Sequence, residues 1–373
     1  MASIPFAASF NRYLRYFDLT SFIITITLTS VSLLFVFSAT YQPCTPYSIF
    51  FKKQALGILS GYILYFFFCV FDYRILQRWG FLAYFLVLGL LVFTIIKGSI
   101  GMGARRWINL GFIKFQPSEL AKLFFPPFFT HYLYTEDDSF TFNFSSFLPT
   151  LIITGISALL IIKQPDLGTG ILILSSSLLL LWVAGVKKKY FYYGLAFCLM
   201  TAPISYRFLR PYQKKRIAVF LGYGDNQNER YQIEQSKIAI GSGGLLGKGL
   251  FEGTQNKFMF LPESRTDFIF SVICEEWGFV GACSILILYL LMILRILQTI
   301  YFIKIPFAQL LALGLLAPFL FSTLINVGMV TGLLPIVGIP LPLMSYGVTH
   351  IWITLASLGW IQGVAIRQHY LGN

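Results

Sequence analysis

Charged side chains are scarce in this 373-residue chain: Asp, Glu, Lys and Arg make up 12% of it, whereas 57% of the residues are hydrophobic. A soluble domain of this length exposes too much surface to be so apolar. Runs such as 172-LILSSSLLLLWVAG-185 fit the ~20-residue length that crosses a bilayer. The composition therefore argues against a soluble enzyme and predicts an all-α polytopic membrane protein.

Histidine and cysteine are also scarce. The three histidines, His131, His350 and His369, lie far apart in sequence, which argues against a histidine metal site or Ser-His-Asp catalysis. The five cysteines are odd in number and lack metal-ligand spacing. We interpret them as small apolar packing residues: Cys44, Cys69, Cys198, Cys274 and Cys283.

Apolar windows predict about ten transmembrane helices in a single domain covering residues 1–373. The first run is too long for the apolar core of a signal peptide, so we expect it to be retained. An even number of spans places both termini on one side, and a modest excess of Lys and Arg there predicts the cytoplasm. The expected spans are 19–40, 54–72, 79–97, 117–134, 147–163, 169–186, 189–206, 267–294, 306–333 and 345–366.

The segment 207–265, between the seventh and eighth spans, is then a long extracytoplasmic loop. It contains ten Lys and Arg residues and five acids, a net charge of +5. Such a charge attracts anionic lipid headgroups or a phosphate-bearing substrate, and the sequence leaves both open. The stretch 210-RPYQKKRIAVFLGY-223 combines cations with an apolar run, as amphipathic interfacial helices do.

A glycine-rich stretch, 241-GSGGLLGKG-249, invites comparison with phosphate-binding loops. A Walker pattern needs Gly at 242 and Ser or Thr at 249, where this chain has Ser242 and Gly249. The dinucleotide fingerprint fails at Leu246. We expect a flexible loop whose backbone amides are open to an anion.

Polar residues inside or beside the spans are candidates for a site. Glu119 and Lys122 lie one helical turn apart after Pro117, and isolated charges in a span are costly, so they should pair. A helix-end role and a functional role both fit such a pair. Asp166, in 164-QPDLGTG-170, lies between two spans, where a turn or a helix cap also explains it.

The stretch 328-GMVTGLLPIVGIPLPLMSYGV-348 is rich in Gly and Pro. It cannot form a continuous helix. Irregular backbone at membrane depth is tolerated where it is buried in protein or lines a cavity. We therefore expect a re-entrant or broken element that forms one wall of a site.

Three carboxylates, Asp267, Glu275 and Glu276, occur in 261-LPESRTDFIFSVICEEWGFVG-281. For a helix that begins near Thr266, Asp267 lies in the first turn at the outer surface and Glu275 lies ~12 Å deeper. Eight residues rotate a helix by ~80° and nine by ~180°, so the three carboxylates cannot form one cluster. A helix-start acid favoured by the macrodipole also explains Asp267, and we interpret the two glutamates as structural residues or members of internal ion pairs.

Six segments, in order along most of the chain, resemble the SEDS family (shape, elongation, division and sporulation). The pattern IGSGGLLGKG…GTQNKFMFLPE is more similar to rod-shape members than to division members. The segments are 103-GARRWINLGFIKFQPSELAKL-123, 164-QPDLGTG-170, 211-PYQKKRIAVFL-221, 231-YQIEQSKIAIGSGGLLGKG-249, 261-LPESRTDFIFSVICEEWGFVG-281 and 326-NVGMVTGLLPIVGIPLPLMSYG-347.

The resemblance implies a ten-span peptidoglycan glycosyltransferase of the bacterial cytoplasmic membrane. It would polymerise lipid II into glycan strands at the outer face for cell elongation, alongside a class B penicillin-binding protein and elongation-machinery membrane proteins, with no nucleic acid. The essential aspartate of the family falls on Asp267, and its membrane acid–base pair falls on Glu119 and Lys122. We expect the remaining substrate-binding or cavity residues to be Arg106, Trp107, Asp166, Arg216, Arg265, Ser345 and Tyr346.

Two segments depart from the family pattern. The family usually continues Ser-Tyr-Gly with another Gly and a Ser, whereas this chain has 345-SYGVTH-350. The segment 222-GYGDNQNER-230 also differs from the usual continuation with Asn or Asp followed by Pro.

Glycosyl transfer from a lipid pyrophosphate needs a base for the attacking hydroxyl and positive charge for the leaving group. We hypothesise that Asp267 deprotonates the sugar 4-OH in an inverting reaction. Lys122, Arg216 and Arg106 would hold the pyrophosphates, a task that Mg²⁺ or Mn²⁺ could share, although the sequence does not show which residues would hold a cation.

Two other classes of function stay open at this point: a lipid II flippase and a non-catalytic scaffold for wall-synthesis partners. A flippase is expected to have inverted repeats and cavity charges that are accessible from both sides. The motifs here cluster at the outer ends of spans, which favours surface chemistry. Scaffolding gives no reason for the buried charges Glu119, Lys122 and Asp267.

Overall fold

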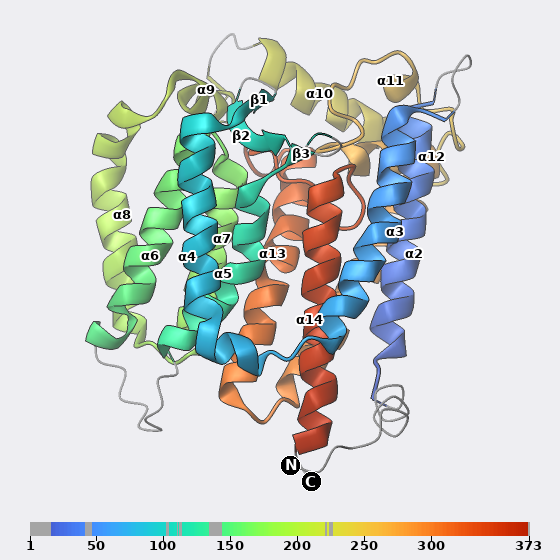
Figure 1. The fold of residues 1–373 in the computed structure, drawn as a ribbon. Coiled ribbons are helices and arrows are strands. Elements are labelled where there is room, and N and C mark those ends of the chain that lie inside the picture. The colour runs from blue at the N-terminus through green and yellow to red at the C-terminus, as the bar shows by residue number, and fades with distance from the viewer. Residues whose placement is uncertain are drawn as a thin grey trace.

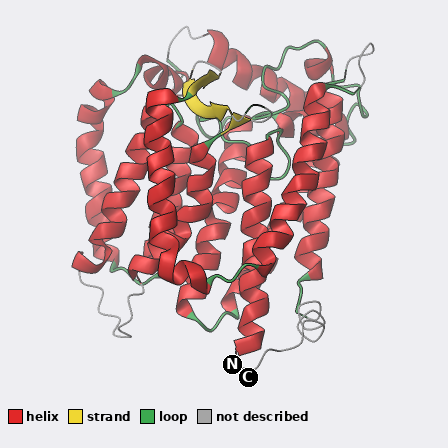
Figure 2. Cartoon of the chain, in the orientation of Figure 1, coloured by secondary structure: helices red, strands yellow, loops and turns green. Residues whose placement is uncertain are grey.

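The structure, a computed structural model, describes residues 16–41, 47–101, 104–109, 111, 114–133, 144–220, 222–223 and 227–371. Long helices run side by side, and a small sheet and short helices gather at one end, which we call the loop end (Figures 1 and 2). Each of the ten predicted spans falls on one long helix. These are α2 (Leu19–Ala39), α3 (Ile49–Val70), α4 (Arg74–Lys97), α5 (Pro117–Leu133), α6 (Phe144–Lys163), α7 (Leu167–Val183), α8 (Lys188–Phe208), α12 (Ile269–Tyr301), α13 (Pro306–Val330) and α14 (Val348–Leu371).

Six of these helices, α2, α3, α4, α12, α13 and α14, are long and apolar enough to cross a membrane by length and composition. The mostly helical fold agrees with the predicted class, and the total of ten spans stays a prediction. α2 begins and α14 ends at the same end of the bundle, opposite the loop end (Figure 1). Cys44 and the departing residues 224–226 lie outside the described part of the chain.

Local signals in the sequence set several helix starts. Ser48 caps α3 by accepting a hydrogen bond from Phe51 N at 3.1 Å. Pro306 begins α13, where the missing N–H of proline costs nothing because the first amides of a helix have no partner within it. Asp166 caps α7 in the same way that Ser48 caps α3.

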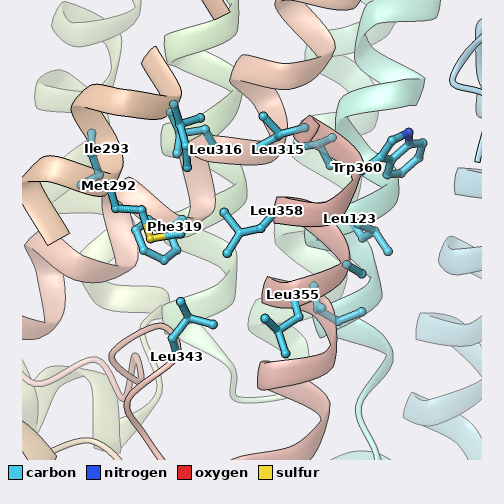
Figure 3. Packing of buried hydrophobic residues seen from close by; sticks show 14 of the residues in the cluster. Leu123, Met292, Ile293, Leu315, Leu316, Phe319, Leu343, Leu355, Leu358 and Trp360 are labelled. Carbon is cyan, nitrogen blue, oxygen red and sulfur yellow. The ribbon is translucent and has the colours of Figure 1, made fainter. Parts of the chain in front are cut away.

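The buried centre of the bundle is α14, which packs against α3, α5 and α13. Two glycines allow α3 to approach it closely: a Cβ at Gly359 would lie 2.1 Å from Tyr65 O, and one at Gly363 would lie 2.4 Å from Cys69 O. Small residues permit such close approach between helices in membranes. Figure 3 shows side chains of this core from α5 (Leu123), α12 (Met292, Ile293), α13 (Leu315, Leu316, Phe319) and α14 (Leu355, Leu358, Trp360).

α8 lies at the edge of the bundle (Figure 1). Nearly all of its described side chains are exposed, including Tyr192, Leu195 and Met200. An apolar surface of this kind needs lipid or another protein around it.

The loop end contains elements that composition alone did not predict. β1 (Ser99–Gly101), β2 (Ala104–Asn109) and β3 (Lys114–Phe115) form a small antiparallel sheet, a minor addition to the predominantly helical fold. The predicted helix in 210–223 is α9 (Pro211–Phe220), and it is followed by α10 (Gln227–Ser242) and α11 (Thr254–Lys257).

The expectation of a flexible glycine loop with free amides is wrong. The amides of Lys248 and Gly249 each donate to a carbonyl of α12, those of Glu275 and Glu276, at 3.0 Å. α12 has non-helical backbone at Gly278, with φ at 65°, and such a break frees backbone groups that need new partners. Beyond this break, Phe279 N and Val280 N donate to Gly244 O and Leu245 O. Loop 243–249 and the kinked helix therefore provide hydrogen-bond partners for each other's backbone groups.

The side chains of Glu275 and Glu276 also form hydrogen bonds with residues at the loop end. Glu275 is fully buried and accepts Lys248 Nζ at 2.7 Å and Thr254 N at 2.8 Å, which confirms the predicted ion pair. Glu276 Oε1 accepts Ser38 Oγ at 2.5 Å, and Ser38 lies one residue before the end of α2. Through these contacts with the folded loop and with the end of α2, both glutamates hold elements of the loop end together.

Close packing at Gly243 gives a direct test of this docking. A Cβ there would lie 1.9 Å from Cys274 O, so we expect Gly243→Ala to force the backbones apart and to destabilise the protein by about 1–3 kcal/mol. Gly241→Ala is the matched control, because a Cβ at Gly241 meets no atom within 4 Å. Thermal unfolding in detergent measures both, and equal unfolding temperatures would contradict the tight docking.

Candidate active site

Asp267 lies in the turn that precedes α12, at the loop end. Its side chain is half-buried. The three consecutive carbonyl oxygens of residues 265–267 accept hydrogen bonds from Tyr346 N, Ser345 Oγ and Asn326 Nδ2, at 2.9, 2.6 and 2.9 Å. The backbone that carries this carboxylate is therefore fixed on three successive residues.

The loop 331–347 between α13 and α14 forms the wall beside Asp267, as the Gly- and Pro-rich sequence predicted. Asn326 donates to Ile339 O at 2.8 Å, with the same amide nitrogen that holds Asp267 O. Gly338, at φ 73°, faces the carboxylate: a Cβ there would lie 3.4 Å from Asp267 Oδ2. Only glycine adopts this backbone region freely, so the close wall depends on it.

Gln54 of α3 supports the same loop and was not predicted. It is fully buried, donates to Ser345 O at 3.2 Å and accepts Gly347 N at 3.2 Å. A glutamine inside an apolar helix was the available signal, because buried amides must find partners.

Burial and, to a smaller extent, the negative charge of Glu263 raise the pKa of Asp267, while the guanidinium groups of Arg216 and Arg106 lower it; the net result is a pKa of about 6. The negative charge of Asp166 also raises this pKa, by a smaller amount. A carboxylate with a pKa near neutrality can take a proton at physiological pH, which is a property of general bases.

Arg106 and Arg216 come from separate elements, β2 and α9. Arg106 Nε is buried without a hydrogen-bond partner, so this guanidinium retains donor capacity. The neighbouring Trp107 is half-buried, and its carbonyl accepts Ser99 Oγ at 3.0 Å across the sheet. The sheet therefore positions Arg106 near Asp267.

The side chains of Arg265 and Tyr346 both contact the ring of Phe50. The guanidinium carbon of Arg265 lies 4.0 Å from the centre of the Phe50 ring, and the Tyr346 ring packs edge-on against Phe50 with centroids 5.4 Å apart. Cation–π contact of this kind holds the Arg265 side chain beside α3. Both residues thus contribute to the site through their backbones and this cluster.

Asp166 connects two helix starts. Its Oδ1 accepts Thr169 N at 3.2 Å as the cap of α7. Its Oδ2 accepts Gln116 Nε2 at 2.8 Å and Ser118 Oγ at 2.9 Å from the start of α5. The predicted cap is confirmed, and the residue also ties α7 to the helix that carries Glu119.

Glu119 and Lys122 form the predicted ion pair, with Oε1 and Nζ 2.7 Å apart and both side chains buried. A third residue, His350 of α14, places Nδ1 3.1 Å from Glu119 Oε2. Sequence spacing argued against a functional histidine, and the tertiary fold brings this one to the pair. The available signal was its position in SYGVTH, where the family pattern changes.

Known proteins resemble this chain over nearly its whole length. The cell cycle protein family FtsW/RodA/SpoVE matches residues 18–370. Peptidoglycan glycosyltransferase MrdB of Escherichia coli K12 is 36% identical over 370 residues, which cover 96% of this chain and 96% of MrdB. Stage V sporulation protein E of Bacillus subtilis 168 is 34% identical over 362 residues, which cover 95% and 98%.

Solved structures agree. A chain of a peptidoglycan synthase complex, solved for its coordination of polymerization and crosslinking, superposes with a TM-score of 0.79 at 28% identity and covers 95% of this chain and 98% of that one. Rod shape determining protein RodA of Thermus thermophilus superposes with a TM-score of 0.69 at 26% identity, with 94% and 96% covered. With sequence and fold matched from end to end, this chain belongs to the FtsW/RodA/SpoVE family of cell cycle proteins.

Proposed function

We propose that this protein is a peptidoglycan glycosyltransferase that polymerises lipid II into glycan strands for cell elongation. The observation that carries the proposal is Asp267: a half-buried carboxylate with a pKa of about 6, held on a fixed backbone between Arg106 and Arg216. The names of the E. coli and Helicobacter pylori relatives, both peptidoglycan glycosyltransferase MrdB, support this activity and favour elongation over division.

In the proposed reaction, Asp267 takes the proton of the sugar 4-OH of the incoming lipid II. The freed oxygen attacks the anomeric carbon of the growing strand from the face opposite its pyrophosphate. The new C–O bond forms as the bond to the pyrophosphate oxygen breaks, so the configuration inverts and polyprenyl pyrophosphate leaves. Positive charge fixed beside the departing oxygens lowers the barrier.

Arg106 and Arg216 are the best placed cations for the pyrophosphate, because both act on Asp267 and Arg106 has an unused donor. Lys122 is buried and already paired with Glu119, so we assign it to the support of the site. In the described part of the chain no three His, Cys, Asp or Glu residues form a metal-sized group. A divalent cation, Mg²⁺ or Mn²⁺, would therefore be held mainly by substrate phosphates with one carboxylate, as Mg²⁺ commonly is.

We further propose a location and a partner. The apolar helices support a multi-pass protein of the bacterial cytoplasmic membrane, with the loop end outside and both termini in the cytoplasm. The similarity to a chain of a peptidoglycan synthase complex supports assembly with a class B penicillin-binding protein that crosslinks the new strands. Contacts with other elongation-machinery membrane proteins belong to the same proposal.

Replacing Asp267 tests whether it is the general base. Asp267→Asn keeps the size of the side chain but cannot accept the proton, so polymerisation of labelled lipid II should fall by about 10²–10⁴-fold. Glu234→Gln, an exposed acid on α10 that pairs with Arg230, is the matched control and should keep the natural rate.

The assay uses purified protein with its transpeptidase partner, and circular dichroism confirms that both variants fold. Full polymerisation by Asp267→Asn would show that Asp267 is not the general base. If the natural protein moves lipid II between leaflets and makes no polymer, it is a transporter and not a glycosyltransferase.

The pH dependence of the rate tests the pKa of Asp267. Since the pKa of Asp267 is raised to about 6, the base is ionised above that pH, and the rate should fall about tenfold per pH unit below it. Glu263→Gln removes a negative charge that raises this pKa, so the acid limb should move to lower pH. Glu252→Gln, which removes an acid paired with Lys257 in the same loop, should leave the limb in place.

Rates of single turnovers between pH 4.5 and 8 give the profile. An acid limb that stays fixed in the Glu263 variant, or a flat profile in the natural protein, would contradict the assignment.

A further inference from the structure

His350 joins two helices through the acid of the buried pair. Glu119 and Lys122 lie on α5 and His350 lies in the first turn of α14. All three side chains are buried, with 6%, 5% and 7% of their surface exposed. A carboxylate has two oxygens, and here Oε1 binds the ammonium while Oε2 binds the ring. The histidine therefore completes the coordination of Glu119.

The hydrogen-bond chemistry fixes which ring nitrogen carries the proton. An ionised carboxylate only accepts, so Nδ1 of His350 must be the donor to Glu119. Lys122 Nζ lies 3.5 Å from the same nitrogen, and a second positive charge beside it would be repelled. The ring is therefore neutral with its proton on Nδ1, and Nε2 is an acceptor.

Nε2 has no protein partner although it is buried. His350 also lines a cavity of about 20 Å³ between α5, α13 and α14, whose polar lining includes Lys122, Ser322, Thr354 and Ser357. Leu315, Phe319 and Leu358, labelled in Figure 3, form part of the apolar wall.

The neighbours of Glu119 and His350 connect this unit to the loop end. Ser118 donates to Asp166, which contributes to the field at Asp267. Thr349 donates to Lys114 O at 3.3 Å, and Lys114 pairs with β2, the strand of Arg106. A bond between Glu119 and His350 thus joins α5 and α14 next to the residues that surround the base.

We propose that His350 is a positioning residue of the active site. Its Nδ1–H holds the second oxygen of Glu119, and the carboxylate and Lys122 thereby keep a single arrangement. The catalytic part of this inference rests on the proposed glycosyltransferase function, whereas the contact itself does not.

Three substitutions separate the donor from the shape of the ring. His350→Asn keeps an N–H at the position of Nδ1 and should retain kcat. His350→Gln moves the amide to the position of Nε2, and His350→Leu has no donor. Both should lower kcat for lipid II polymerisation by about ten- to a hundredfold, with little change in KM, because a hydrogen bond to a buried charge is lost.

A second measurement does not depend on activity. In a double-mutant cycle by thermal unfolding, Glu119→Gln and His350→Leu should be non-additive, since the first weakens and the second removes the same contact. His131→Leu, a histidine near the opposite end of α5, replaces His350→Leu in the control cycle and should be additive with Glu119→Gln.

The outcomes are distinct. An unchanged kcat in both the Leu and Gln variants, or an Asn variant as slow as they are, overturns the positioning role. Additive unfolding of positions 119 and 350 overturns the contact. If the natural protein makes no polymer, the proposed function fails, and the unfolding cycle still decides whether His350 holds Glu119.

Discussion

The site depends on the hydrogen bonds that tie residues 265–267 to α13 and the loop that follows it. Each of three successive carbonyls is held by a separate donor, from Tyr346, Ser345 and Asn326. A hydrogen bond adds only about 1 kcal/mol to stability, but an unpaired buried carbonyl costs more, so the arrangement is favoured mainly because the alternatives are poor. It places Asp267 on rigid backbone although the residue belongs to a turn.

A second set of contacts holds the long loop that precedes Asp267. Loop 243–249 and the kink at Gly278 exchange backbone hydrogen bonds, and Glu275 pairs with Lys248 from the same loop. Buried ion pairs gain little net energy because desolvation offsets the attraction, but removing one partner leaves a charge stranded. The pair therefore favours one position of the loop on α12, because any other position would leave a buried charge without its partner. Gly243 and Gly247 allow the two backbones to approach closely, and the amides of Lys248 and Gly249 are used within the protein.

Below the base, Glu119, Lys122, His350 and Asp166 connect α5, α7 and α14. Buried polar groups need hydrogen-bond partners, and Glu119 and Asp166 find theirs on other helices. Polar residues that are far apart in sequence therefore connect neighbouring helices. A site at the ends of several spans can then be held in register even though no single helix carries it.

The sequence alone determined the class of the protein and the approximate limits of its long helices, because some 20 apolar residues have few alternatives to a membrane helix. It also determined the Glu119–Lys122 pair, since helical spacing brings residues i and i+3 together. Only the tertiary structure decided that His350 completes this pair, that Gln54 and Asn326 hold the wall, and that the glycine loop is packed. Those contacts join residues separated by tens to hundreds of positions, and local periodicity contains no information about which helices become neighbours.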